Sequence, residues 1–95
     1  MAEDLGPKEG YLRVKIVSPT EIVWDGEADS VQIPTPDGVR LFIPKKAPLI
    51  CLLAQGEIII NRTGHLPLKY IVSNGVCEIR RDICAILTYQ TVSDS

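Results

Sequence analysis

The chain is organised around one stretch, residues 37–49, which reads Asp37-Gly38-Val39-Arg40-Leu41-Phe42-Ile43-Pro44-Lys45-Lys46-Ala47-Pro48-Leu49. Asp37-Gly38 predicts a tight turn, because Gly38 can adopt a positive φ without steric cost. The apolar run that follows this turn predicts a short strand. Pro44 and Pro48 each fix φ and remove a backbone donor, so we expect a defined, non-helical basic loop between them.

Short strands and turns continue in both directions from this stretch. Residues 12–16 and 28–33 alternate polar and apolar side chains, which is the period of a half-buried strand. Asp25-Gly26 is expected to end a strand, and Pro67 indicates an edge position for the strand that contains it. The expected strands are residues 12–16, 22–24, 28–33, 39–43, 49–54, 57–61, 66–70, 76–79 and 83–89.

Turn signals recur about every 8–12 residues, which is typical of all-β domains. The sequence therefore predicts an all-β fold, a small antiparallel β-sandwich or flattened barrel of about eight to ten short strands. No segment shows the period of a long helix. We expect a flexible N-terminal tail at residues 1–10, one β domain at residues 11–89 and a C-terminal tail at residues 90–95.

The composition excludes several classes of function. With 95 residues the chain is one domain, and its net charge of −2 lacks the basic excess that a general nucleic-acid binder needs. No apolar run approaches the roughly 20 residues of a membrane span, so direct membrane insertion is not expected. The N-terminus is acidic and has no apolar core, so it does not resemble a signal peptide.

Catalytic and cofactor motifs are missing from the sequence. It contains neither GxxxxGK[ST] nor GxGxxG, so no cofactor is expected. Cys51, Cys77 and Cys84 lie in apolar runs, have no CxxC spacing and are interpreted as buried, reduced thiols. One histidine, His65, does not complete a zinc site. The acidic side chains near the second turn are interpreted as turn carboxylates rather than an acid–base pair; they are Glu21, Asp25, Glu27 and Asp29.

Several predicted strands carry large apolar side chains on both faces, as in Leu41-Phe42-Ile43, Ile58-Ile59-Ile60 and Ile86-Leu87. A strand of a small sandwich has only one face toward the core. The outward set either forms an apolar patch for a partner or is covered by termini and loops.

An ordered set of segments is similar to the epsilon subunit of F-type ATP synthases over about residues 11–89. The segments are Leu12-Arg13-Val14-Lys15-Ile16-Val17-Ser18-Pro19, Gly26, Val31-Gln32-Ile33-Pro34, Gly38, Phe42-Ile43-Pro44-Lys45-Lys46-Ala47-Pro48-Leu49, Gly56 and Tyr70-Ile71-Val72-Ser73-Asn74-Gly75-Val76. The resemblance implies the N-terminal β-sandwich domain of that family.

The resemblance also implies a function. In the family this domain is non-catalytic, packs on the gamma subunit at the foot of the central stalk and touches the c-subunit rotor ring, helping to couple ion translocation to ATP synthesis. It would be a peripheral membrane protein on the cytoplasmic face of the bacterial inner membrane. The residues implied for the ring contact are Pro36, Asp37, Gly38, Val39, Arg40, Lys45 and Lys46, and those for the gamma contact are Ser18 and Phe42.

The sequence departs from the family in three places. Lys45-Lys46 stands where the family usually has Gly-His, and Leu41 stands where it usually has a second glycine. The ring contacts are therefore expected to be rebuilt around the two lysines. The sequence ends at Ser95, before the family's C-terminal helical hairpin, so neither hairpin-type inhibition nor a hairpin nucleotide site is expected.

Two other functions are open alternatives to the stalk subunit. One is a free-standing β-barrel binding module for a small ligand or protein partner. An oligonucleotide-binding barrel would need a basic groove with stacking aromatics, which this sequence does not offer. The other is a small enzyme that uses a cysteine, and such an enzyme would require a reactive thiol.

Overall fold

The computed structural model describes residues 8–89 and 91–93, which form ten strands. The strands are β1 (Leu12–Val17), β2 (Ile22–Ala28), β3 (Ser30–Thr35), β4 (Gly38–Phe42), β5 (Leu49–Leu53), β6 (Gly56–Asn61), β7 (Leu68–Val72), β8 (Gly75–Arg80), β9 (Ile83–Thr88) and β10 (Thr91–Ser93). No helix occurs among these residues, so the predicted all-β class is confirmed.

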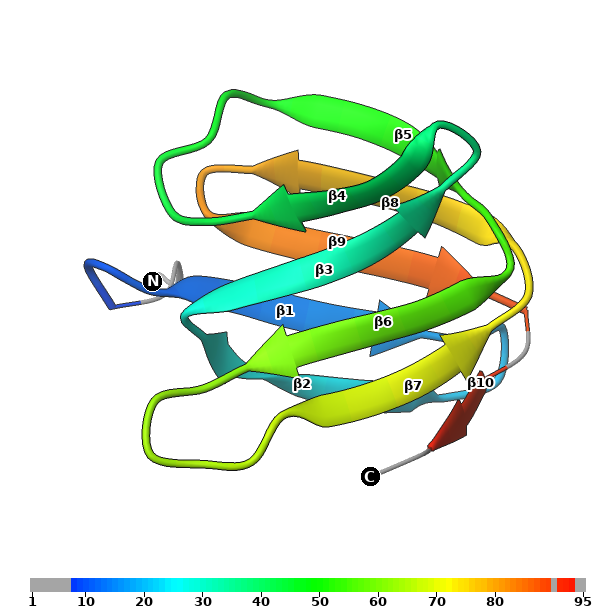
Figure 1. The fold of residues 1–95 in the computed structure, drawn as a ribbon, viewed down its shortest axis with the longest axis horizontal. Helices are drawn as coiled ribbons and strands as arrows, with labels where there is room; N and C mark the ends of the chain where they lie inside the picture. Colours follow the sequence, from blue (N-terminus) through cyan, green and yellow to red (C-terminus); the bar gives the residue numbers. More distant parts are fainter. Residues whose placement is uncertain (1–7, 90, 94–95) are drawn as a thin grey trace.

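The strands form two five-stranded sheets that face each other as a sandwich (Figure 1). The first sheet has the order β2-β1-β9-β8-β5, and the second has the order β10-β7-β6-β3-β4. Every described pairing is antiparallel except that between β1 and β9, which is parallel. The predicted β-sandwich is confirmed, and its one parallel ladder lies where the first strand joins the sheet beside β9.

The core lies between the two sheets and consists of the inward side chains of the alternating strands. In β1, Leu12, Val14 and Ile16 are completely buried, as the alternation predicts. Phe42 and Ile33 oppose them from the second sheet and are buried as well. The largest fully buried side chains are Phe42, Leu12, Ile16, Ile33, Ile58, Ile60, Ile79 and Ile86.

Two local predictions from turn residues are wrong. Asp25-Gly26 does not end a strand: β2 continues to Ala28, because Asp25 and Gly26 pair in register with Lys15 and Val14 of β1. The chain reverses at Asp29 instead. Pro67 precedes β7, which is not an edge strand, because β10 pairs with its Tyr70–Val72 half.

The expected tails lie partly outside the described residues. Residues 1–7 of the expected N-terminal tail are not described, and residues 8–10 lead directly into β1. The range 90–95, expected as a C-terminal tail, includes the short strand β10, while residues 90, 94 and 95 are not described.

Replacing Gly75 with alanine tests how closely the β8–β9 ladder is packed. Gly75 has φ 153° and an added Cβ would lie 1.9 Å from the carbonyl oxygen of Leu87, so the backbone would have to shift. We expect Gly75→Ala to lower the free energy of unfolding by about 3–5 kcal/mol, measured by urea denaturation.

The matched control is Gly64→Ala. Gly64 has φ 83° but no atom within 4 Å of the added Cβ, so this variant introduces backbone strain without a clash. Its expected loss is about 1–2 kcal/mol. Equal losses in the two variants would contradict the close packing of Gly75 against Leu87.

Candidate functional site

The residues implied for the rotor-ring contact lie along one edge of the second sheet. β4 is the last strand of that sheet, and its residues Val39, Arg40 and Leu41 are all exposed. Residues 36–40 form the turn before β4 and the first part of that strand, whereas Lys45 and Lys46 follow its other end (Figure 1). The seven residues are therefore not one loop cluster but a strip along the β4 edge, which we call the β4 strip.

The turn at the first end of the β4 strip is held by a buried threonine. Thr35 Oγ1 donates to the carbonyl oxygen of Gly38 at 2.6 Å and accepts from the amide of Asp37 at 3.2 Å. Gly38 has φ 115°, as its turn position requires. The turn is thus fixed in shape, and it presents Pro36, Asp37 and the 70% exposed Val39 at the surface.

The loop at the other end of the β4 strip is tied to the first sheet. The amide of Lys45 donates to Asp82 Oδ1 at 2.6 Å, and Lys45 itself has φ 68°, in the left-handed region. The ammonium of Lys46 lies 5.9 Å from the centre of the Phe42 ring. Both lysines are exposed, so their charges are available to a partner.

Ser18 and Phe42, the residues implied for the gamma contact, have opposite environments. Ser18 lies in the β1–β2 turn, where its Oγ accepts from the amide of Glu21 at 3.2 Å. Phe42 is completely buried in the core. A side chain without exposed surface cannot contact a partner directly, so the assignment of Phe42 to that contact is corrected to a core role.

An apolar row crosses the outer face of the first sheet, and sequence reasoning did not find it as a unit. Strand register aligns Leu52 with Val76, Val76 with Leu87, Leu87 with Val17 and Val17 with Ile22. Leu52 is 64% exposed, Leu87 46% and Ile22 66%. The apolar row comprises Leu52, Val76, Leu87, Val17 and Ile22 from the five strands of this sheet.

The apolar row borders an open depression in the sheet surface. The depression has a volume of about 360 Å³ and is lined by Val17, Val76, Glu78, Ala85, Ile86 and Leu87. The sequence indicated this depression only through the large apolar side chains that several strands carry on their outward faces. That set is divided between the sheets, because Leu41 and Ile59 lie on the second sheet on either side of Gln32, whereas Leu87 lies on the first.

The three cysteines lie near one another on the inner side of the first sheet. The Sγ atoms of Cys77 and Cys84 are 3.6 Å apart, and Cys51 is the register partner of Cys77. The hydrogen bond with Cys84 and then burial raise the pKa of Cys77, and burial raises the pKa of Cys51. A raised pKa disfavours the nucleophilic thiolate, so the arrangement argues against a cysteine enzyme.

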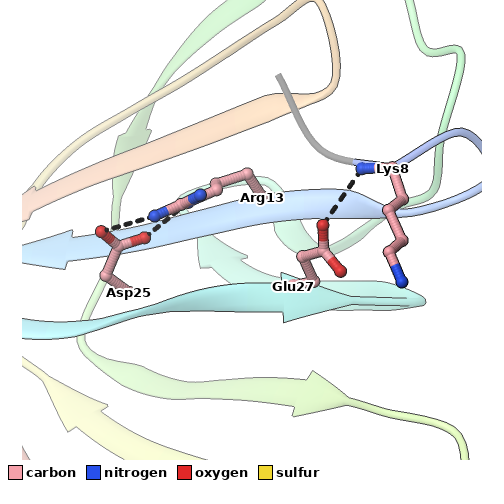
Figure 2. A network of polar contacts seen from close by, with 4 residues as sticks. All are labelled: Lys8, Arg13, Asp25 and Glu27. Atoms are coloured by element: carbon pink, nitrogen blue, oxygen red, sulfur yellow. Dashed lines mark hydrogen bonds and ion pairs between the residues drawn. The ribbon is translucent and has the colours of Figure 1, made fainter. Parts of the chain in front are cut away.

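The carboxylates near the second turn have separate structural partners (Figure 2). Asp25 accepts from Arg13 Nε at 2.8 Å and Nη2 at 3.1 Å, and Glu27 accepts from the amide of Lys8 at 3.0 Å. Asp29 accepts from the amide and hydroxyl of Thr63. These bonds fasten β2 and the residue that follows it to other parts of the chain, and they leave no acid–base pair among these three carboxylates.

Within residues 8–89 and 91–93, no group of three or more His, Cys, Asp or Glu side chains is arranged to hold a metal ion. No helix in the same residues is long and apolar enough to cross a membrane.

Comparisons with known proteins agree with the sequence resemblance. Residues 11–94 match a family model described as "ATP synthase, Delta/Epsilon chain, beta-sandwich domain". The ATP synthase epsilon chain of Frankia casuarinae is 37% identical over 76 residues, which cover 80% of this chain and 89% of that protein. The epsilon chain of Leptospira borgpetersenii is 34% identical over 77 residues, which cover 81% of this chain and 60% of that protein.

Solved structures share the fold at low sequence identity. A chain in the cryo-EM structure of the Euglena gracilis mitochondrial ATP synthase, comprising OSCP, F1 and c-ring, has a TM-score of 0.83 at 16% identity; the match covers 97% of this chain and 57% of that one. A chain in the central stalk and c-ring structure of the Tetrahymena thermophila mitochondrial ATP synthase has a TM-score of 0.72 at 14% identity, with coverages of 85% and 65%.

The Arg13–Asp25 pair gives the domain a pH-dependent stability. The hydrogen bond from Arg13 lowers the pKa of Asp25 below its usual value of 3.8. A depressed pKa contributes stability above the unfolded pKa, and this stability disappears as the pH falls through the folded pKa. Above about pH 4 we expect the free energy of unfolding of the wild-type protein to exceed that of Asp25→Asn. The difference should be at most about 1 kcal/mol, because the pair is partly exposed to solvent.

The measurement is chemical denaturation of both proteins between about pH 7 and pH 2. Arg13→Gln is the companion variant: with Asp25 intact but its partner removed, the same acid-dependent difference should shrink. A wild-type advantage that persists unchanged at the acid end would contradict the assignment.

Proposed function

Because this chain belongs to the ATP synthase delta/epsilon family of β-sandwich domains, we propose that it is a non-catalytic epsilon-type subunit of the central stalk. In this role it links the gamma subunit to the rotor ring and couples ion translocation to ATP synthesis. As part of the complex it is peripheral to the membrane, on the cytoplasmic face of the bacterial inner membrane. The family match over residues 11–94 is the observation that carries this proposal.

The apolar row is the proposed surface for gamma. Five neighbouring strands place it across the sheet, so at about 4.8 Å per strand it extends roughly 19 Å. Large exposed apolar side chains in a continuous row are typical of a protein interface, and permanent interfaces are the more hydrophobic class. Ser18 directly follows Val17, which is a member of the row, so the residue implied for gamma by resemblance lies beside this surface.

The β4 strip is the proposed surface for the rotor ring. It combines a fixed turn at one end, the exposed Val39 and Arg40 along the strand, and two lysines at the other end. β4 lies on the second sheet, whereas the apolar row lies on the first. Gamma and the ring would therefore occupy different surfaces of the domain at the same time, which a linking subunit requires.

The core supports a mechanical role between these surfaces. Among the residues whose burial the structure describes, fifteen hydrophobic ones are buried in one continuous cluster that joins both sheets. Close-packed interiors have low compressibility and transmit strain. Such a core would pass a displacement of one sheet on to the other with little compression.

Charge in the apolar row should disrupt gamma binding. Leu52→Glu with Leu87→Glu places one carboxylate at the end and one in the middle of the proposed interface, where burial without a partner is costly. We expect the affinity for the gamma subunit of the same complex to fall at least about 100-fold, measured by interferometry. Ile71→Glu, at an exposed position of the second sheet, is the matched control and should bind normally.

Wild-type protein that fails to bind gamma at micromolar concentration would overturn the gamma proposal. Equal losses in the double variant and in Ile71→Glu would place the interface elsewhere.

Changing Val39 should separate ring coupling from gamma binding. Val39→Asp puts a carboxylate at the exposed centre of the β4 strip without touching the core. In the reassembled complex we expect proton-driven ATP synthesis to fall several-fold, while gamma affinity stays within about twofold of wild type. Unchanged synthesis in a complex that contains the variant would contradict a ring contact at Val39.

A further inference from the structure

Two loops bring four exposed cations together at one end of the sandwich. Lys45 and Lys46 belong to the loop between β4 and β5, whereas Arg80 and Arg81 lie at the end of β8 and in the turn before β9. Figure 1 shows this loop beside this turn, and the hydrogen bond from the Lys45 amide to Asp82 Oδ1, 2.6 Å long, joins them. We call these four residues the basic corner.

The basic corner carries a net positive charge, because its four cations lie beside one carboxylate, that of Asp82. Among the described residues, no carboxylate lies within ion-pair distance of any of these four cations. The ion pair found there joins Arg13 and Asp25 instead. Asp82, the acid nearest in sequence, accepts from a backbone amide instead. Its own carbonyl oxygen accepts from the amide of Arg13 at 2.9 Å, so the turn is fixed on both sides.

Two residues of the basic corner, and Asp82 beside them, have a left-handed backbone conformation. Lys45 has φ 68°, Arg81 has φ 54° and Asp82 has φ 63°. Side chains other than Gly, Asn and Asp are uncommon in this left-handed region, where each costs free energy. Strained residues held in place by their surroundings are frequent at binding sites, and here lysine and arginine occupy such positions.

The rest of the chain has the opposite charge. The chain has ten basic and twelve acidic residues, so setting the basic corner aside leaves six basic against twelve acidic ones. Glu21 and Asp37, in the turns at the opposite end of the sandwich, are both exposed. Screening in salt limits each charge to roughly 8–10 Å, so a narrow ligand at the corner would meet four cations and one acid, Asp82, without meeting the acids at the opposite end.

We propose that the basic corner binds an acidic polypeptide segment, a short run of Asp and Glu side chains on a partner protein. Guanidinium groups bind carboxylates through paired hydrogen bonds, and the ammonium groups of Lys45 and Lys46 add mobile donors beside them. A membrane surface or a nucleic acid is a broad polyanion that would also face the acidic remainder of the chain, so a narrow peptide is favoured.

This inference extends beyond the proposed function. Lys45 and Lys46 also belong to the β4 strip, but Arg80 at the end of β8 and Arg81 in the turn that follows lie outside that strip. The site can be tested in the isolated chain without gamma or the ring, so its failure would leave the stalk proposal standing.

The test is fluorescence anisotropy with labelled hexaglutamate as the probe, at about 50 and about 200 mM sodium chloride. The wild-type chain should bind, and binding should weaken at the higher salt. Lys45→Asn with Arg81→Asn removes two cations while keeping residues that tolerate the left-handed region, so the variant should fold. We expect its affinity for hexaglutamate to be at least about fivefold lower.

Lys46→Gln with Arg80→Gln tests the other two cations and should give a similar loss. The matched control removes two cations from elsewhere, Lys15 on β1 and Lys69 on β7, as Lys15→Gln with Lys69→Gln. The control should bind within about twofold of wild type. An equal loss in the control would show that only net charge matters and would overturn the proposal.

Two further measurements distinguish an acidic peptide from other anions as the ligand. Sedimentation with vesicles of about 30% phosphatidylserine should give weaker binding than hexaglutamate; tighter binding lost in the same variants would assign the corner to lipid and overturn the proposal. Displacement of hexaglutamate by inorganic phosphate at about 1 mM would reveal a single-ion site and would overturn it as well. Absence of hexaglutamate binding at the lower salt would do the same.

Discussion

The parallel ladder between β1 and β9 is the contact on which the rest of the structure depends. It joins residues 13–17 to residues 83–87, and it is the connection that brings β1 and β2 into the sheet formed by β9, β8 and β5. Because its register sets Val17 beside Leu87, it also makes the apolar row continuous across all five strands. A slip of one residue would turn Leu87 inward and Ile86 outward, destroying core and surface together.

Sequence alternation predicted most strands because the period of two depends only on which side chains face the core. Leu12, Val14 and Ile16 show this directly. The pairing partners were not predictable in the same way: nothing local to β1 indicates that residues about 70 positions away will lie parallel to it. Asp25-Gly26 failed as a turn signal because cross-strand bonds to β1 outweighed the local turn preference of the two residues.

The candidate surfaces also differ in whether local sequence or long-range strand pairing defines them. The seven residues of the β4 strip are implied by the family resemblance, and they are close enough in the chain to be named without the topology. Phe42 was misassigned because every residue of Leu41-Phe42-Ile43 is apolar, and periodicity cannot tell which of them face inward; the register with Val31 places Phe42 in the core. The apolar row and the basic corner each combine residues from distant strands, so both required the topology.

The arrangement of the surfaces suits the proposed role of so small a domain as a link. The apolar row lies on one sheet, the β4 strip lies on the edge of the other, and the basic corner lies where the β4–β5 loop passes between the sheets. The bond from Lys45 to Asp82 fastens this loop to the first sheet, so the two surfaces are connected by a fixed crossing as well as by the core. A partner bound at one surface is therefore held in a defined position relative to a partner at the other.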